Sequence, residues 1–217
     1  MVRHGQSVAN RDGVMQGQYD APLSDLGRSQ AAILGAWLRE RGIVWDAAYT
    51  SPLSRARDTA RCLTDAVGKP EATPEDDLLE VHAGSMQQKT RVELEAQHPT
   101  FFQRDITGLG DYSEFGGESY DDVQVRVQRL IGKLTAAHRE PNHTVLLVSH
   151  GGLLFQLAKA LVCVPVPRVC LLRFSNCSVT RVQLRERRGS YLGEIVWHLP
   201  IELIGAEPSG GAAALLY

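Results

Sequence analysis

The run Thr144-Val145-Leu146-Leu147-Val148 constrains the fold of this chain more than any other stretch. It has no polar alternation, which is the pattern of a strand covered on both faces, as in parallel sheets. Ser149-His150-Gly151-Gly152 follows it directly, and a helical pattern then extends from about Leu153 to Val162. A buried strand, a turn with a reactive side chain and a helix therefore follow one another, which predicts an α/β fold.

Two further segments have the same order of elements. The apolar run within 43–50 precedes Ser51-Pro52, which predicts a helix with a serine N-cap and a proline in its first turn, ending at Gly68. Arg55 then lies in the first turns of that helix. Near the start of the chain, Arg3-His4-Gly5 follows only two residues, so either the strand there is very short or the sequence as given starts late.

These three turns are expected to meet, because ligands in open α/β sheets bind outside the carboxyl ends of the strands. His4 with Arg3, Arg55 and His150 would then face one pocket. Helix N-termini arrive at the same edge, and their free N–H groups favour anions. The spacing therefore predicts a phosphate-binding site.

The remaining patterns complete a three-layer α/β/α domain with a mostly parallel central sheet and helices on both faces. They predict helices over 24–41, over 89–107 with a break at Pro99, and from Ser119 to near Pro141; a short strand and a loop carrying Glu80 over 69–88; a loop over 109–117; and strands near 170–175, 177–184 and 194–199. We assign one domain to residues 1–204 and a loose tail rich in small residues to 205–217.

Composition excludes several classes of protein. Apolar residues form 43% of the 217 residues, enough for a sizeable core, and the net charge of −2 argues against nucleic-acid or acidic-membrane binding. No apolar stretch approaches the length of a membrane span. The four cysteines form no C-x-x-C pair and no secretory signal precedes Arg3, so we expect a cytoplasmic protein with reduced thiols. The oligomeric state is left open, with a homodimer as one option.

Five motifs in order resemble the histidine phosphatase superfamily, in its phosphoglycerate-mutase-like branch. The match covers roughly residues 2 to 185, which makes it far more specific than any single motif. Its segments are Arg3-His4-Gly5 with Ser7, Asn10, Gln16-Gly17, Asp20, Leu23-Ser24, Gly27 and Gln30-Ala31; Ser51-Pro52-Leu53-Ser54-Arg55-Ala56 with Thr59-Ala60; Leu79-Glu80 with Gly84; Gly116-Gly117-Glu118-Ser119; and Ser149-His150-Gly151-Gly152.

The resemblance implies a metal-independent phosphomonoesterase that acts on a small phosphorylated metabolite. His4 would be the nucleophile that forms a phosphohistidine, and Glu80 would be the general acid and then the base that activates water. The implied phosphate-binding and pocket residues are Arg3, Asn10, Gln16, Gly17, Arg55, His150 and Gly151. Arginines would supply the positive charge, and no carboxylate cluster that would hold Mg²⁺ is visible, so no metal or other cofactor is expected.

Two departures from the family pattern bear on function. The first strand is mostly missing, and Ser85-Met86-Gln87-Gln88 replaces the usual acidic-glycine stretch after Gly84. Two alternatives therefore stand beside the phosphatase: a cofactor-dependent phosphoglycerate mutase, and a catalytically inactive phosphate-binding regulatory module. The mutase must bind a second acidic group on its substrate, and the expected lid between Val81 and Glu118 offers only Lys89, Arg91 and Arg104 for this.

Overall fold

The computed structural model describes residues 1–104, 111–163, 172–187 and 190–206. Within these ranges the sheet has six strands in the order β3-β2-β4-β1-β5-β6. The first four strands of that order run parallel, and β5 and β6 form an antiparallel hairpin at one side. The strands are β1 (Val2–Arg3), β2 (Ala47–Thr50), β3 (Thr73–Pro74), β4 (Val145–Ser149), β5 (Val179–Arg187) and β6 (Ser190–Leu199).

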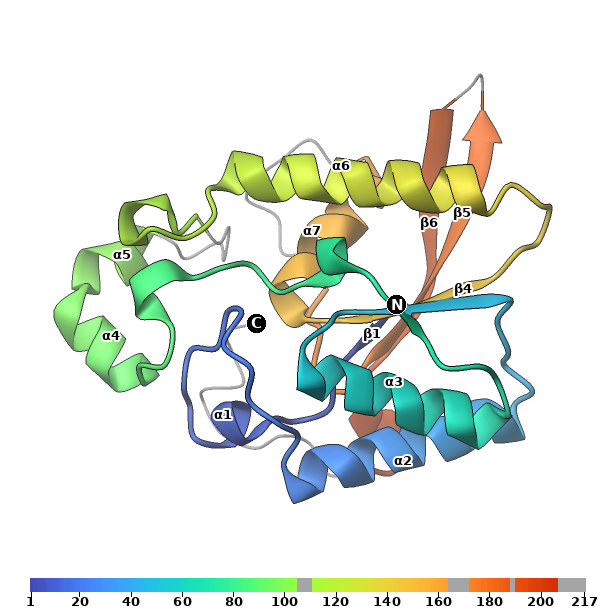
Figure 1. The fold of residues 1–217 in the computed structure, drawn as a ribbon, viewed down its shortest axis with the longest axis horizontal. Helices are drawn as coiled ribbons and strands as arrows, with labels where there is room; N and C mark the ends of the chain where they lie inside the picture. Colours follow the sequence, from blue (N-terminus) through green and yellow to red (C-terminus); the bar gives the residue numbers. More distant parts are fainter. Residues whose placement is uncertain (105–110, 164–171, 188–189, 207–217) are drawn as a thin grey trace.

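Helices cover both faces of this sheet (Figure 1). α2 and α3 lie together on one face, and α6 and α7 lie on the other. α4 and α5 project away from the sheet, at the left of the view in Figure 1. The α-helices are α1 (Val8–Arg11), α2 (Asp25–Glu40), α3 (Ser54–Val67), α4 (Arg91–Gln97), α5 (Pro99–Arg104), α6 (Tyr120–Ala137) and α7 (Gly151–Leu161).

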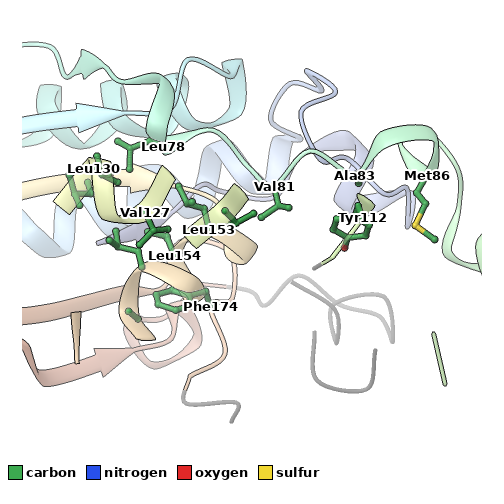
Figure 2. Packing of buried hydrophobic residues seen from close by; sticks show 14 of the residues in the cluster. Leu78, Val81, Ala83, Met86, Tyr112, Val127, Leu130, Leu153, Leu154 and Phe174 are labelled. Atoms are coloured by element: carbon green, nitrogen blue, oxygen red, sulfur yellow. The ribbon is translucent and has the colours of Figure 1, made fainter. Parts of the chain in front are cut away.

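The central strand β4 explains the two-sided core. Leu147 packs into the cluster beneath α6 and α7, whereas Leu146 and Val148 pack into the cluster beneath α2 and α3. Figure 2 shows that the cluster beneath α6 and α7 extends in space from Leu130 and Leu154 to Ala83 and Met86. The apolar run at 145–148 is therefore buried on both faces, as its lack of alternation predicts.

β1 is two residues long, yet it is held on both sides. Val2 pairs with Val148 of β4 in parallel and with Val179 of β5 in antiparallel. The His4 amide donates to the carbonyl oxygen of Ser149 at 2.9 Å, and the Cys177 amide donates to the carbonyl oxygens of Arg3 and His4. These bonds fix the turn that follows β1, so a short strand is sufficient to anchor it.

Several predicted boundaries are wrong. The helix expected from Ser51-Pro52 begins at Ser54, because the Asp20 carboxylate accepts from the Ser54 amide and hydroxyl and so caps α3 across the chain. The strand near 170–175 is absent at 172–175, and residues 170–171 lie outside the described ranges. Ala206, which was assigned to the loose tail, is buried in the core beneath α2 and α3. Residues 207–217 lie outside the described ranges. None of the described helices is both long and apolar enough to cross a membrane.

Candidate active site

The carboxyl ends of β1, β2 and β4 meet at one edge of the sheet, and the residues that follow them form the site. The centroids of the His4 and His150 rings lie 5.0 Å apart, with the ring planes inclined at 59°. Both rings are almost completely buried. The structure thus brings together the two histidines that the sequence places 146 positions apart, because β1 and β4 are neighbours in the sheet.

The His4 ring is oriented by its own turn. Nδ1 lies 2.6 Å from the carbonyl oxygen of Gly5. A carbonyl oxygen can only accept, so Nδ1 carries the proton and Nε2 keeps its lone pair. The Gly5 amide in turn donates to the Thr59 hydroxyl at 3.0 Å, which ties this turn to α3. In the neutral ring, Nε2 is therefore the nucleophilic nitrogen, and the turn holds it in a fixed position.

The tautomer of His150 is also determined by its partners. The Arg55 Nε donates to His150 Nδ1 at 3.2 Å, so that nitrogen must be the acceptor. His150 Nε2 then carries the proton and donates to the Ser51 hydroxyl oxygen at 2.7 Å. Ser51, expected to be a helix cap, instead positions this ring.

Arg55 is completely buried at the start of α3. Its Nη1 and Nη2 donate to the carbonyl oxygens of Tyr19 and Gly17, each at 2.8 Å. No carboxylate within the described residues forms a salt bridge with it. Its three partners are neutral acceptors, which orient the guanidinium without neutralising it.

Gly17 must be glycine for two reasons. Its φ angle is +50°, and a Cβ there would lie 2.9 Å from the Ala83 amide nitrogen and 2.4 Å from the Gln87 side-chain oxygen. The neighbouring Gln16 is buried, and its side-chain oxygen accepts from the Ser7 hydroxyl at 2.8 Å. Gln16 and Gly17 therefore shape the loop that holds Arg55.

Arg3 projects from the end of β1 and is also buried. Its Nη1 donates to the carbonyl oxygen of Phe174. Its Nε is buried without a hydrogen-bond partner in the described part of the chain. A buried N–H group of a charged donor without a partner is costly, and an anionic ligand is the partner that its charge favours.

Asn10 contributes through its amide. Its side-chain oxygen accepts from the Ser7 amide at 3.2 Å and from the Asn176 side-chain nitrogen at 3.3 Å. Asn176 also donates to the carbonyl oxygen of His4 at 3.0 Å. With the oxygen of Asn10 already used twice, its NH₂ group is the part left for an anion. Asn176 was not among the predicted site residues.

Glu80 lies at the N-terminus of α7, the helix that Gly151 opens. Its Oε1 accepts from the amides of Val81 and Leu153, each at 2.9 Å, and its Oε2 accepts from the Gly152 amide at 3.2 Å. A Cβ on Gly152 would lie 2.7 Å from Oε1. The carboxylate is therefore anchored against a helix end that also carries His150, its N-cap residue.

Comparison with known proteins decides the family. The model of the histidine phosphatase superfamily (branch 1) matches residues 1–193. The chain belongs to this superfamily. A glucosyl-3-phosphoglycerate phosphatase of Mycobacterium tuberculosis is 34% identical over 96% of this chain and 95% of its own length. A metal-independent phosphoserine phosphatase of Arabidopsis thaliana is 32% identical over 71% of this chain and 64% of its own length.

Solved structures agree with this assignment. A mycobacterial glucosyl-3-phosphoglycerate phosphatase in complex with VO₃ superimposes with a TM-score of 0.78 at 33% identity, covering 91% of this chain and 96% of that chain. The same kind of enzyme bound to inorganic phosphate gives a TM-score of 0.76 at 32% identity, covering 93% and 97% of the two chains. The predicted family, the α/β fold with its mostly parallel sheet, and the phosphatase activity on small phosphate monoesters are confirmed.

The electrostatics of this histidine phosphatase favour an anionic ligand. Burial, then the charges of Arg55 and Arg3, hold the pKa of His4 well below 6.5, and the same causes act on His150. Burial also lowers the pKa of Arg3 and of Arg55 to about 10, which leaves both charged at neutral pH. The site thus combines two neutral imidazoles with two buried cations, and a phosphate dianion matches that charge.

The described residues contain no group of three or more histidine, cysteine or acidic side chains that could hold a metal ion. The donors around His4 are guanidinium, imidazole and amide groups, which suit phosphate oxygens rather than a cation. Glu80 is the acidic side chain whose charge acts on both arginines. Positive charge for the reaction is therefore available from Arg3 and Arg55.

Proposed function

We propose that this phosphatase acts in two steps at His4, with Glu80 as the proton donor and acceptor. In the first step, His4 Nε2 forms a bond to phosphorus while the ester P–O bond breaks and the leaving oxygen takes a proton from Glu80. In the second, water attacks phosphorus, Glu80 takes a proton from it, and the P–N bond breaks to release phosphate and restore His4. The hydrogen bond from His4 Nδ1 to Gly5 carries this proposal, because it directs the lone pair of Nε2 to the site.

Arg3, Arg55 and Asn10 would hold the phosphoryl oxygens, and His150 would join them by turning its Nε2–H from the Ser51 hydroxyl to the ligand. Phosphoryl transfer depends on positioning and on stabilising charge spread over three equatorial oxygens. Buried donors fixed before the ligand arrives are worth far more than the same donors in water. The orientation of Arg55 by three neutral acceptors fits this requirement.

Glu80 has one oxygen suited to proton transfer. Oε1 already accepts two amides, whereas Oε2 accepts one. A carboxylate oxygen has about two lone-pair sites, so Oε2 is the atom that can hold and deliver the proton. A general acid in such a position typically contributes about 10²–10⁴-fold to the rate.

The first substrates to test come from the relatives. Glucosyl-3-phosphoglycerate and phosphoserine appear in the names of the mycobacterial and plant enzymes. Beside the loop that carries Glu80, the Gln18 backbone amide donates to Gln87 Oε1 at 2.7 Å and the Gln18 side chain donates to the carbonyl oxygen of Glu80 at 3.0 Å.

A phosphoglycerate mutase is the second candidate, and lid contacts count against it. Lys89 donates to Gln97 at 3.3 Å, and Arg91 forms an ion pair with Glu95 at 2.6 Å while its guanidinium stacks on Phe102. Both lid cations whose side chains the structure describes are therefore engaged within or beside α4. With these partners, neither Lys89 nor Arg91 is positioned to bind a second acidic group of the substrate.

The test is phosphate release from a panel of small monoesters without added metal, compared with isomerisation of phosphoglycerate. We expect release to dominate and to vanish in His4→Asn. Brief incubation with a radioactive phosphate donor should label the wild-type enzyme on an acid-labile histidine. Isomerisation faster than release would favour the mutase, and failure to label any histidine would favour an inactive phosphate-binding module.

A further inference from the structure

The motif Gly116-Gly117-Glu118-Ser119 supplies Glu118 to a bidentate, largely buried ion pair. Arg126 of α6 donates from Nε and Nη2 to the two carboxylate oxygens of Glu118, each at 2.8 Å. The two side chains are 9% and 20% exposed. Burying an arginine costs desolvation free energy, even when the arginine is paired. The other contacts of Arg126 therefore indicate which part of the structure it serves.

Those other contacts all go to the segment that carries Glu80. Arg126 Nη1 donates to the carbonyl oxygens of Asp77 at 3.1 Å and Leu79 at 2.6 Å, and Nη2 lies 3.4 Å from the carbonyl oxygen of Glu80 itself. A planar guanidinium can hold several acceptors in a fixed relation, which a lysine ammonium cannot. The Arg126 side chain thus holds the backbone from Asp77 to Glu80.

Glu118 holds the same segment from the other side of Glu80. Its Oε2 accepts from the His82 amide at 2.8 Å, and its own amide donates to the carbonyl oxygen of His82 at 2.9 Å. Gly117 permits this approach, since a Cβ there would lie 2.2 Å from the same His82 oxygen. The ion pair therefore contacts the chain at 77, 79, 80 and 82, and brackets the proposed acid.

We propose that Arg126, paired with Glu118, is a positioning residue that sets the Glu80 carboxyl at the distance from which it protonates the leaving oxygen. The inference rests on the proposed role of Glu80. A misplacement of about 1 Å can cost roughly 10²-fold in rate even when the mutation is remote from the reacting atoms. Within the described residues, Arg126 forms hydrogen bonds with Glu118 and with the carbonyl oxygens of Asp77, Leu79 and Glu80, none of which is a predicted phosphate-binding side chain. Its loss should therefore weaken protonation of the leaving group more than phosphate binding.

Leaving-group dependence separates this role from a structural one. An alkyl phosphate needs its leaving oxygen protonated, whereas p-nitrophenolate leaves as a stable anion and needs little help from an acid. A protein that is only partly folded loses both activities in proportion. A protein whose acid is misplaced loses the alkyl activity selectively.

The experiment compares kcat/KM for an alkyl phosphate and for p-nitrophenyl phosphate in four variants: Glu80→Gln, Arg126→Lys, the charge-neutral pair Glu118→Gln with Arg126→Met, and Arg129→Lys. Arg129 is the matched control, since it lies one turn further along α6 and contacts the Asp77 side chain rather than the backbone of Glu80. The double variant removes both charges together, so no lone buried carboxylate remains to unfold the protein.

We expect Glu80→Gln and both Arg126 variants to lose about 10-fold or more in kcat/KM for the alkyl ester and less than about 3-fold for p-nitrophenyl phosphate, with vanadate inhibition unchanged. Arg129→Lys should match the wild type on both. Equal losses on the two esters in the Arg126 variants, with Glu80→Gln still selective, would overturn this inference alone. An unselective Glu80→Gln would overturn the proposed acid and this inference together.

Discussion

Replacing Arg55 with methionine tests whether its buried charge serves the ligand or the fold. The guanidinium donates to two backbone carbonyls and to His150, and each hydrogen bond from a charged donor contributes about 1.5–3 kcal/mol. Against this, burying a charge without a salt-bridge partner costs several kcal/mol. The two effects oppose each other, so we expect the ligand-free Arg55→Met variant to lose no more than about 3 kcal/mol of unfolding free energy.

The Arg55→Met substitution should weaken vanadate binding much more than it lowers the free energy of unfolding. Vanadate at about 100 times its dissociation constant stabilises a protein by about 2.7 kcal/mol, which is roughly a 5–10 °C rise in Tm for a chain of this size. Loss of one preorganised donor to an oxyanion costs about 10²-fold or more. At the same vanadate concentration the variant would gain only about 0.4 kcal/mol, or about 1–2 °C.

Thermal unfolding with and without vanadate is the assay, with kcat/KM measured beside it. Arg57→Met is the matched control, because Arg57 lies on the same helix but is exposed. The control should keep the full vanadate shift and its activity. If Arg55→Met keeps the wild-type shift while its ligand-free Tm collapses, Arg55 stabilises the fold and the reasoning about its charge is wrong.

Three further perturbations have defined outcomes. His4 and His150 have folded-state pKa values well below 6.5, so the unfolded state binds more protons and stability should fall as the pH drops below 6.5, by about 1 kcal/mol per histidine at one pH unit lower. Urea unfolding midpoints between pH 7.5 and 5.5 should show this slope, and replacing both rings with asparagine should reduce it by their share, since burial also lowers the pKa of His138 and His198. An unchanged slope would contradict the assignment. Asn176→Ala should lower kcat/KM by about 10-fold or more because the turn bearing the His4 nucleophile loses a side-chain bond, and steady-state kinetics at unchanged Tm would show it. Gly152→Ala places a Cβ 2.7 Å from Glu80 Oε1, so kcat for an alkyl phosphate should fall while vanadate inhibition persists, and an unaltered kcat would show that the carboxylate can move without cost.

Much of the fold could be predicted because it follows local patterns. The unbroken apolar run at 144–148 predicts a strand buried on both faces, and the Ser24 cap with its helical stripe predicts α2 within a residue at each end. Pro99 separates α4 from α5 where the break was expected. These features depend on neighbours within a turn or a strand, which a sequence displays directly.

The features that could not be predicted depend on partners far along the chain. Ser51 has the sequence of a helix cap, but the His150 ring binds its hydroxyl, and Asp20 caps α3 in its place. Arg126 lies in an amphipathic helix, where an arginine usually faces water, yet Glu118 and three carbonyls bury it. In each case a long-range polar contact outweighs the local preference, and only the fold brings the partners together.

The charge of the site explains why its two histidines and two arginines must be considered as one unit. Arg3 and Arg55 remain cationic in a buried setting, and burial, assisted by the charges of these two arginines, keeps the pKa of both imidazoles low and the rings neutral. A protonated His4 could not attack phosphorus, whereas a neutral one beside two guanidiniums can, once a dianion has offset their charge. The cations proposed to bind the phosphate thus also help to keep the proposed nucleophile in its reactive form, so removing either arginine should impair binding and chemistry at once.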